Sequence, residues 1–160
     1  EGGAEPKQSQ SAEREIREYE QILSSQPDNF DALLKLANLW IEKGQPDRAI
    51  PLMEKLVQLQ PNSLDLQLNL AQVYKLAGQK QKAETAYDQI LSKEKDNLAA
   101  LVSKAVIRSE QGDDKTAKVL FVQAEQAAPG SLKTKIRAIA DHTLQSPAQA
   151  LPVAKQHSQF

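Results

Sequence analysis

The sequence contains no cysteine, and this absence removes two kinds of chemistry. None of the 160 residues can form a disulfide or supply a thiolate ligand to a metal. The chain can therefore fold in a reducing or an oxidising compartment. Cytoplasm, periplasm and thylakoid lumen all stay open as locations, for a soluble or a membrane-tethered domain.

An excess of one charge and long apolar runs are also missing. The 20 basic and 21 acidic residues leave a net charge of -1, which supplies no field to attract nucleic acid or an anionic membrane. No run approaches the roughly 18 apolar residues that a membrane span requires. We expect no nucleic-acid partner, and membrane contact only through an anchor upstream of Glu1, where the chain starts without a methionine.

Groups suited to catalysis are scarce. Histidine, the side chain best suited to acid–base catalysis, occurs only at His142 and His157, and we expect the first near a helix end and the second in a tail. Asp113 and Asp114 follow Gly112 at a turn, where they can cap the next helix instead of binding a metal. No glycine-rich phosphate loop is present. We expect no enzyme activity, cofactor, metal site or small-molecule substrate.

What the sequence does contain is a period of 34 residues. Three glycines mark it, with a helix-capping residue fifteen positions before each, an alanine seven before and another alanine five after. These columns are Asn29, Ser63 and Asn97; Ala37, Ala71 and Ala105; Gly44, Gly78 and Gly112; Ala49, Ala83 and Ala117. Four columns in register indicate a stack of repeated units.

Each unit reads as two helices joined at the glycine. In the first unit, apolar residues recur with helical spacing at Leu33, Leu36 and Trp40, and a second helix begins near Pro46. The alanines allow two antiparallel helices to approach closely, because both present a small side chain there. The large residues around them should fill the core: Trp40, Met53, Tyr74, Tyr87 and Phe121.

The register divides the chain into seven predicted segments. At either end the alanine column changes, to Glu15 and Ile139, so we expect a terminal helix without a second partner there. Ser131 continues the capping column. The segments are a disordered leader (1–10), a half-repeat helix (11–28), three repeats (29–62, 63–96 and 97–130), a capping helix (131–144) and a disordered tail (145–160).

This pattern resembles the tetratricopeptide repeat (TPR) over roughly residues 11–144. Lys95 in place of a closing proline, and Lys104 and Arg108 in the third unit, depart from it. The resemblance implies an all-α fold, a right-handed α-solenoid of antiparallel helix pairs with about eight helices. It also implies that proteins or peptides bind a concave surface lined by the first helix of each unit.

The concave face is the candidate site. Aliphatic residues lie five positions after each capping residue, and amides lie beside them, so an extended peptide could be held by its side chains and its backbone. The same residues could instead only pack against neighbouring helices. The candidates are Leu34, Lys35, Asn38, Ile41, Leu68, Asn69, Gln72, Val102, Ser103 and Val106.

The resemblance also allows a comparison with one TPR subclass, which binds a C-terminal carboxylate through two asparagines and three basic residues. Asn38 and Asn69 match the asparagines, but Leu34, Ala99 and Ser103 stand at the basic positions. A carboxylate would lack its charge-assisted hydrogen bonds, so we do not expect that clamp.

Two functions remain. The first is a non-catalytic scaffold that binds a partner segment in the groove, as an assembly factor for a larger membrane complex. The richness in glutamine, 19 residues, favours this by analogy with membrane-tethered TPR assembly factors of bacteria and plastids. The alternative is a self-associating module, a homo-oligomer formed through a stack end, the groove or the tail around Leu151, Pro152 and Val153.

Overall fold

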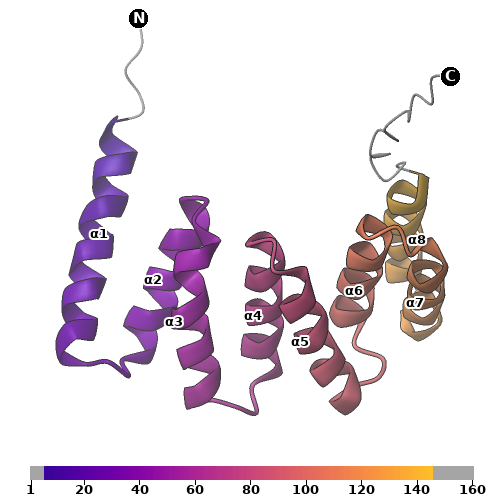
Figure 1. Ribbon diagram of the computed structural model, residues 1–160, viewed down its shortest axis with the longest axis horizontal. Coiled ribbons are helices and arrows are strands. Elements are labelled where there is room, and N and C mark those ends of the chain that lie inside the picture. The colour runs from indigo at the N-terminus through magenta and orange to yellow at the C-terminus, as the bar shows by residue number, and fades with distance from the viewer. Residues whose placement is uncertain (1–5, 146–160) are drawn as a thin grey trace, which may run out of the picture. The chain divides into compact units, whose positions relative to one another are not determined.

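The computed structural model describes residues 6–145, with side chains from Gln10 onward, and shows an all-α chain (Figure 1). This part of the chain contains eight helices and no strand, which confirms the predicted fold class. The helices are α1 (Pro6–Ser25), α2 (Phe30–Glu42), α3 (Pro46–Leu59), α4 (Leu64–Leu76), α5 (Lys80–Lys93), α6 (Leu98–Glu110), α7 (Asp114–Ala127) and α8 (Gly130–Gln145).

The chain divides into two compact units, Glu1–Lys93 and Glu94–Phe160. Unit 1 holds α1 to α5 and unit 2 holds α6 to α8. Within each unit, helices that follow one another along the chain pack side by side (Figure 1). In unit 2, α8 also contacts α6. The division falls beside Lys95, the residue that stands where the first and third repeats have a closing proline.

The predicted capping residues begin the first helix of each repeat. The side chains of Asn29, Ser63 and Asn97 accept a hydrogen bond from the backbone N–H three residues later, at 3.0, 3.4 and 3.0 Å. Each satisfies one of the N–H groups that a helix leaves without a partner at its start. Helix starts are therefore determined locally, by one side chain.

The repeat glycines end the same helices. Gly44, Gly78 and Gly112 have φ values of 70°, 74° and 83°, in the left-handed region that other residues adopt only with strain. After each glycine, the next N–H bonds the carbonyl five residues earlier at 2.8 Å, which closes the helix end. The glycine column therefore exists because of the turn.

The alanine columns form the contact between paired helices. All six alanines, from Ala37 to Ala117, have no exposed surface. Tyr87 and Phe121 lie among the largest fully buried side chains, and Trp40 and Tyr74 are buried too. The prediction that the repeat aromatics form the core is confirmed.

At the two ends, the residues that replace the column alanines are exposed. Glu15 on α1 is exposed and Ile139 on α8 is 42% exposed, whereas the six column alanines have no exposed surface. None of the helices within residues 6–145 is long and apolar enough to span a bilayer.

The predicted boundaries at the ends need correction. The leader prediction, 1–10, is wrong for residues 6–10, because α1 begins at Pro6. Proline suits the first helical position, and lysine and glutamine are good helix formers even without an apolar stripe. Residues 1–5 lie outside the described part of the chain.

At the other end, Ser131 is not a cap. It lies inside α8, which begins at Gly130, and the Pro129 carbonyl accepts the hydrogen bond from Leu132 N–H at 2.9 Å. Pro129 lacks an N–H and already has a helix-compatible φ, so the helix starts directly after it. Gln145, predicted as the start of the tail, is the last residue of α8, and residues 146–160 lie outside the described part.

Candidate protein-binding site

A hollow of about 190 Å³ opens on the face of unit 1 formed by α2 and α4. Met53 of α3 is almost fully buried beneath it, while Leu76 at its rim is 53% exposed. The hollow is lined by Leu34, Asn38, Ile41, Met53, Asn69, Gln72, Val73 and Leu76.

Helical spacing brings these residues together. Leu34, Asn38 and Ile41 follow one another at intervals of four and three residues, which places them on one face of α2. On α4 the interval from Asn69 to Gln72 is three residues, and Val73 and Leu76 extend the same face. The two faces belong to consecutive repeats, so the 34-residue period sets them next to each other.

The lining combines apolar side chains with amides, and none of its eight residues is ionisable. Leucine, isoleucine and methionine can receive an apolar side chain, while Asn38 and Asn69 carry donors and acceptors for a peptide backbone. Small-molecule sites usually occupy about 300–1,000 Å³. This hollow is smaller, so it suits one or two side chains of a polypeptide.

A hydrogen bond from α5 fixes the side chain of Gln72. The hydroxyl of Tyr87, a buried residue of α5, donates a hydrogen bond to Gln72 Oε1 at 3.2 Å. This bond uses one lone pair of the amide oxygen and fixes the side chain, whose amide nitrogen remains a donor; Gln72 itself is exposed. Gln72 can therefore offer a hydrogen bond to a backbone carbonyl of a bound segment.

A second hydrogen bond joins α4 to α3. The Tyr74 hydroxyl donates to Glu54 Oε1 at 2.5 Å. Burial, followed by this bond to a carboxylate and its negative charge, raises the pKa of Tyr74 to about 12. The hydroxyl therefore stays protonated at neutral pH and keeps the two helices joined.

The sequence predicted five of the lining residues, from Leu34 to Gln72. The other predicted residues do not line the hollow: Lys35 is exposed on α2, and Leu68 is half-buried on α4. Val102, Ser103 and Val106 are half-buried residues of α6 in unit 2. Partner binding at any of these residues stays a prediction.

Met53, Val73 and Leu76 were missed. Met53 and Val73 read as core residues, and they are buried; only packing shows that one side of each borders the hollow. Leu76 could have been predicted from the sequence, because the same column holds Glu42 and Glu110 in the other repeats. A large apolar residue in a polar column is typical of a surface with a function.

Of the acidic pair at the third turn, Asp113 has the predicted capping role and Asp114 has another hydrogen bond. Asp113 accepts a hydrogen bond from Thr116 N–H at 3.1 Å, and the bonds from Thr116 lower the pKa of Asp113. Asp114 accepts from the Ser109 hydroxyl at 2.8 Å. Within the described residues no three metal-binding side chains converge, and His142 is exposed on α8. His157 lies outside them.

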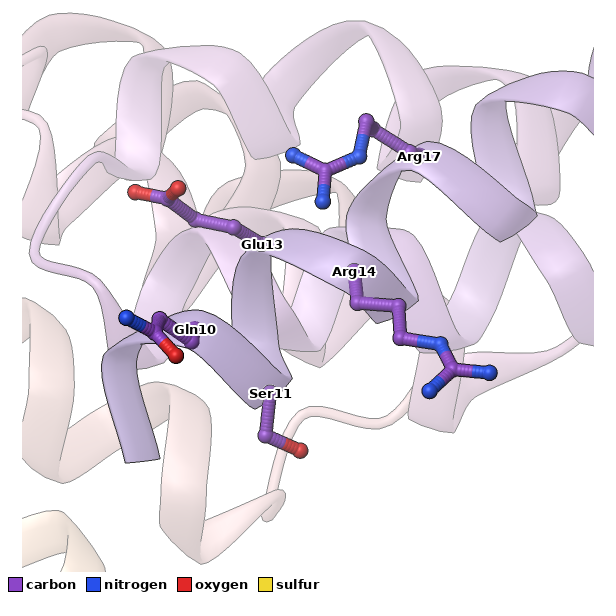
Figure 2. Close-up of a pocket in the computed structure, with 5 residues that line it drawn as sticks. All are labelled: Gln10, Ser11, Glu13, Arg14 and Arg17. Carbon is purple, nitrogen blue, oxygen red and sulfur yellow. The ribbon is translucent and has the colours of Figure 1, made fainter. Parts of the chain in front are cut away.

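A shallow hollow on α1 is lined by Gln10, Ser11, Glu13, Arg14 and Arg17 (Figure 2). Figure 2 shows the guanidinium groups of Arg14 and Arg17 pointing in different directions. Arg14 pairs with Glu18 at 3.1 Å, and Glu13 pairs with Lys43 at 3.5 Å. The charged groups pair with other side chains and do not converge on one point, so this surface is a weak candidate.

The fold, its capped helix pairs and its concave hollow define a TPR protein, and comparison with known families agrees. The model of the cytochrome c-type biogenesis protein H TPR domain matches residues 6–133. The chain belongs to this family, and it is a protein-interaction module of the kind that binds proteins or peptides.

Solved structures show the same fold at low sequence identity. A crystal structure of MamA has a TM-score of 0.62 and 22% identity, and the match covers 81% of this chain and 80% of that one. The structure titled MamA MSR-1 C2 has a TM-score of 0.64 and 18% identity, with 75% and 69% covered. A search of curated proteins finds no match.

Proposed function

We propose that the hollow between α2 and α4 binds an apolar side chain from an extended segment of a partner protein, and that the role is non-catalytic. The single observation that carries this is the lining: aliphatic side chains around a buried methionine, with amides beside them and no ionisable group. Such a surface recognises a polypeptide through one anchor and its backbone. In unit 2, Val102, Ser103 and Val106 of α6 are proposed as partner-contacting residues independently of the hollow in unit 1.

The family name suggests the partner. We propose that the chain acts in the biogenesis of c-type cytochromes as an assembly factor that holds a polypeptide segment for other proteins of a larger membrane complex. Haem attachment in such cytochromes uses a C-x-x-C-H sequence. These 160 residues contain no cysteine, so they supply no thiol for chemistry on that sequence, and holding the client is the role that their surface suits.

The test compares two exposed leucines of unit 1. Leu76→Glu places a charge at the rim of the hollow, and Leu59→Glu places the same charge on α3, outside the lining. Binding of labelled peptides that span a c-type cytochrome precursor is measured by fluorescence polarisation. We expect Leu76→Glu to weaken binding about tenfold or more, equivalent to about 1.4 kcal/mol, because the charge must be desolvated.

Leu59→Glu should leave the affinity unchanged, and both variants should keep the wild-type melting temperature within a few degrees. Equal loss of binding in both variants would contradict the proposed site. Self-association is distinguished by light scattering: a dimer that depends on protein concentration and disappears in Leu76→Glu would assign the hollow to a second copy of the chain.

A further inference from the structure

The outer face of α7 carries an apolar patch that the fold does not use. Val119 and Val122 are 62% and 53% exposed and stand one turn apart. With Lys118, Gln123 and Gln126 they line a shallow hollow of about 330 Å³ in unit 2. We call Val119 and Val122 the α7 valine patch. It faces away from the buried residues of the same helix, such as Phe121.

The other repeats show that this patch is a departure from the pattern. In the columns of Val119 and Val122, α5 has Thr85 and Asp88, and α3 has Pro51 and Glu54. Valine is a weaker helix former than most residues, and here both valines remain more than half exposed. An exposed apolar pair at this cost to the helix indicates a surface that is covered by another segment.

The end of α8 places the remaining chain close to this patch. The Ser109 hydroxyl lies 2.8 Å from Asp114 Oδ1 and 3.5 Å from the Thr143 carbonyl oxygen, so α8 ends next to the start of α7. Val119 and Val122 lie about 8 and 12 Å further along α7, at 1.5 Å per residue. The six residues that follow Gln145, up to Leu151, can extend about 20 Å, enough to go around the helix and reach the patch.

The sequence beyond α8 carries a matching pair. Leu151 and Val153 are separated by Pro152, which favours an extended backbone in the residue before it. In an extended segment the side chains two residues apart lie on one side, about 6.6 Å from each other. Neighbouring residues on a helix face, such as Val119 and Val122, are about 5–6 Å apart. The two pairs therefore fit each other in spacing and in chemistry.

We propose that residues 146–160 dock on the outer face of α7 in the same molecule, with Leu151 and Val153 resting on the α7 valine patch. Gln126, which is exposed beside the patch, supplies an amide for the backbone of the docked segment. This face is separate from the hollow of unit 1, so the inference does not depend on the proposed function.

Because the chain has no cysteine, a disulfide can form only between two cysteines that are introduced, and its formation reports their contact. The test pair is Val122→Cys with Val153→Cys in the full chain, oxidised with dilute oxidised glutathione at low protein concentration. The control pair is Ile139→Cys with Val153→Cys. Ile139 is an exposed apolar residue of the same unit and is closer in sequence to the tail. Circular dichroism verifies that both variants keep the wild-type helix content.

We expect an intramolecular disulfide to form about tenfold faster in the test pair, because docking raises the local concentration of one thiol at the other. Adding Leu151→Ser to the test pair should bring its rate down to that of the control. Equal rates in the two pairs would overturn the proposal. Disulfide-linked dimers instead of monomers would also overturn it, and would assign the patch to a second copy.

Discussion

Helices α5 and α7 occupy the same place in successive repeats, yet they resemble each other on only one face. On the inner face both bury an alanine followed four residues later by an aromatic ring; on the outer face one helix is polar and the other apolar. The inner residues are Ala83 and Tyr87 in α5, Ala117 and Phe121 in α7. The outer residues are Thr85 and Asp88 in α5, Val119 and Val122 in α7.

The difference between the inner and outer faces shows which positions of a repeat can vary in sequence. Inner columns touch the paired helix, so a change of volume there costs stability in every repeat. Residues of the outer columns in α5 and α7 are exposed, so they can change with less effect on the packed pair of helices. We therefore expect surfaces for partners at exposed apolar residues that leave the repeat pattern, such as Leu76 in unit 1 and Val122 in unit 2.

The largest expected effect separates the two faces of α7. Phe121→Ala should lower the free energy of unfolding by about 3–5 kcal/mol, because it leaves a cavity in a fully packed site. Val122→Ala, one residue further along the helix, should change it by no more than about 0.5 kcal/mol. Urea denaturation followed by circular dichroism measures both. Similar losses in the two variants would remove the distinction between inner and outer columns.

A smaller effect tests the alanine column. Ala83→Leu should destabilise by about 1–3 kcal/mol, since a larger side chain overpacks the contact between α4 and α5. The matched control is Glu15→Leu, in the same column of α1, where the residue is exposed. It should stay within about 0.5 kcal/mol of the wild type in the same denaturation measurement. A stable Ala83→Leu protein would show that the alanine is not needed for close approach.

The smallest effect compares two glycines, Gly78 in the turn before α5 and Gly130 at the start of α8. Gly78→Ala should cost about 1–2 kcal/mol, because its φ of 74° is strained for any residue with a Cβ. Gly130 lies in the first turn of α8 without a positive φ, and a Cβ there meets open space. Gly130→Ala should therefore stabilise the chain by about 0.4–1 kcal/mol. Melting temperatures that move in the same direction would contradict this difference.

The residues predicted most accurately act through their own neighbours in sequence. A cap such as Asn29 bonds a group three residues away, and Gly44 bends the backbone at its own position. The start of α1 was missed because residues 6–10 carry no apolar stripe, which was the signal used for helices. Ser131 was misjudged as a cap because the preceding Pro129 starts α8 one residue earlier.

The candidate site was predicted only in part for a related reason. Helical spacing identifies the exposed face of one helix, so Leu34, Asn38 and Ile41 could be grouped from sequence. Spacing cannot show that Met53, from another helix, lies under that face, or that Leu68 stands outside the lining. Those facts depend on how three helices pack.

By itself the sequence determined the class of this protein: a 34-residue period, helix pairs joined at glycine and close contact through alanine. These properties follow from interactions within one turn or one pair of helices, which local chemistry specifies. The tertiary structure decided which outward side chains gather into a hollow around Met53 and which, like Val119 and Val122, remain exposed. Burial depends on neighbours distant in sequence, and only packing brings those neighbours together.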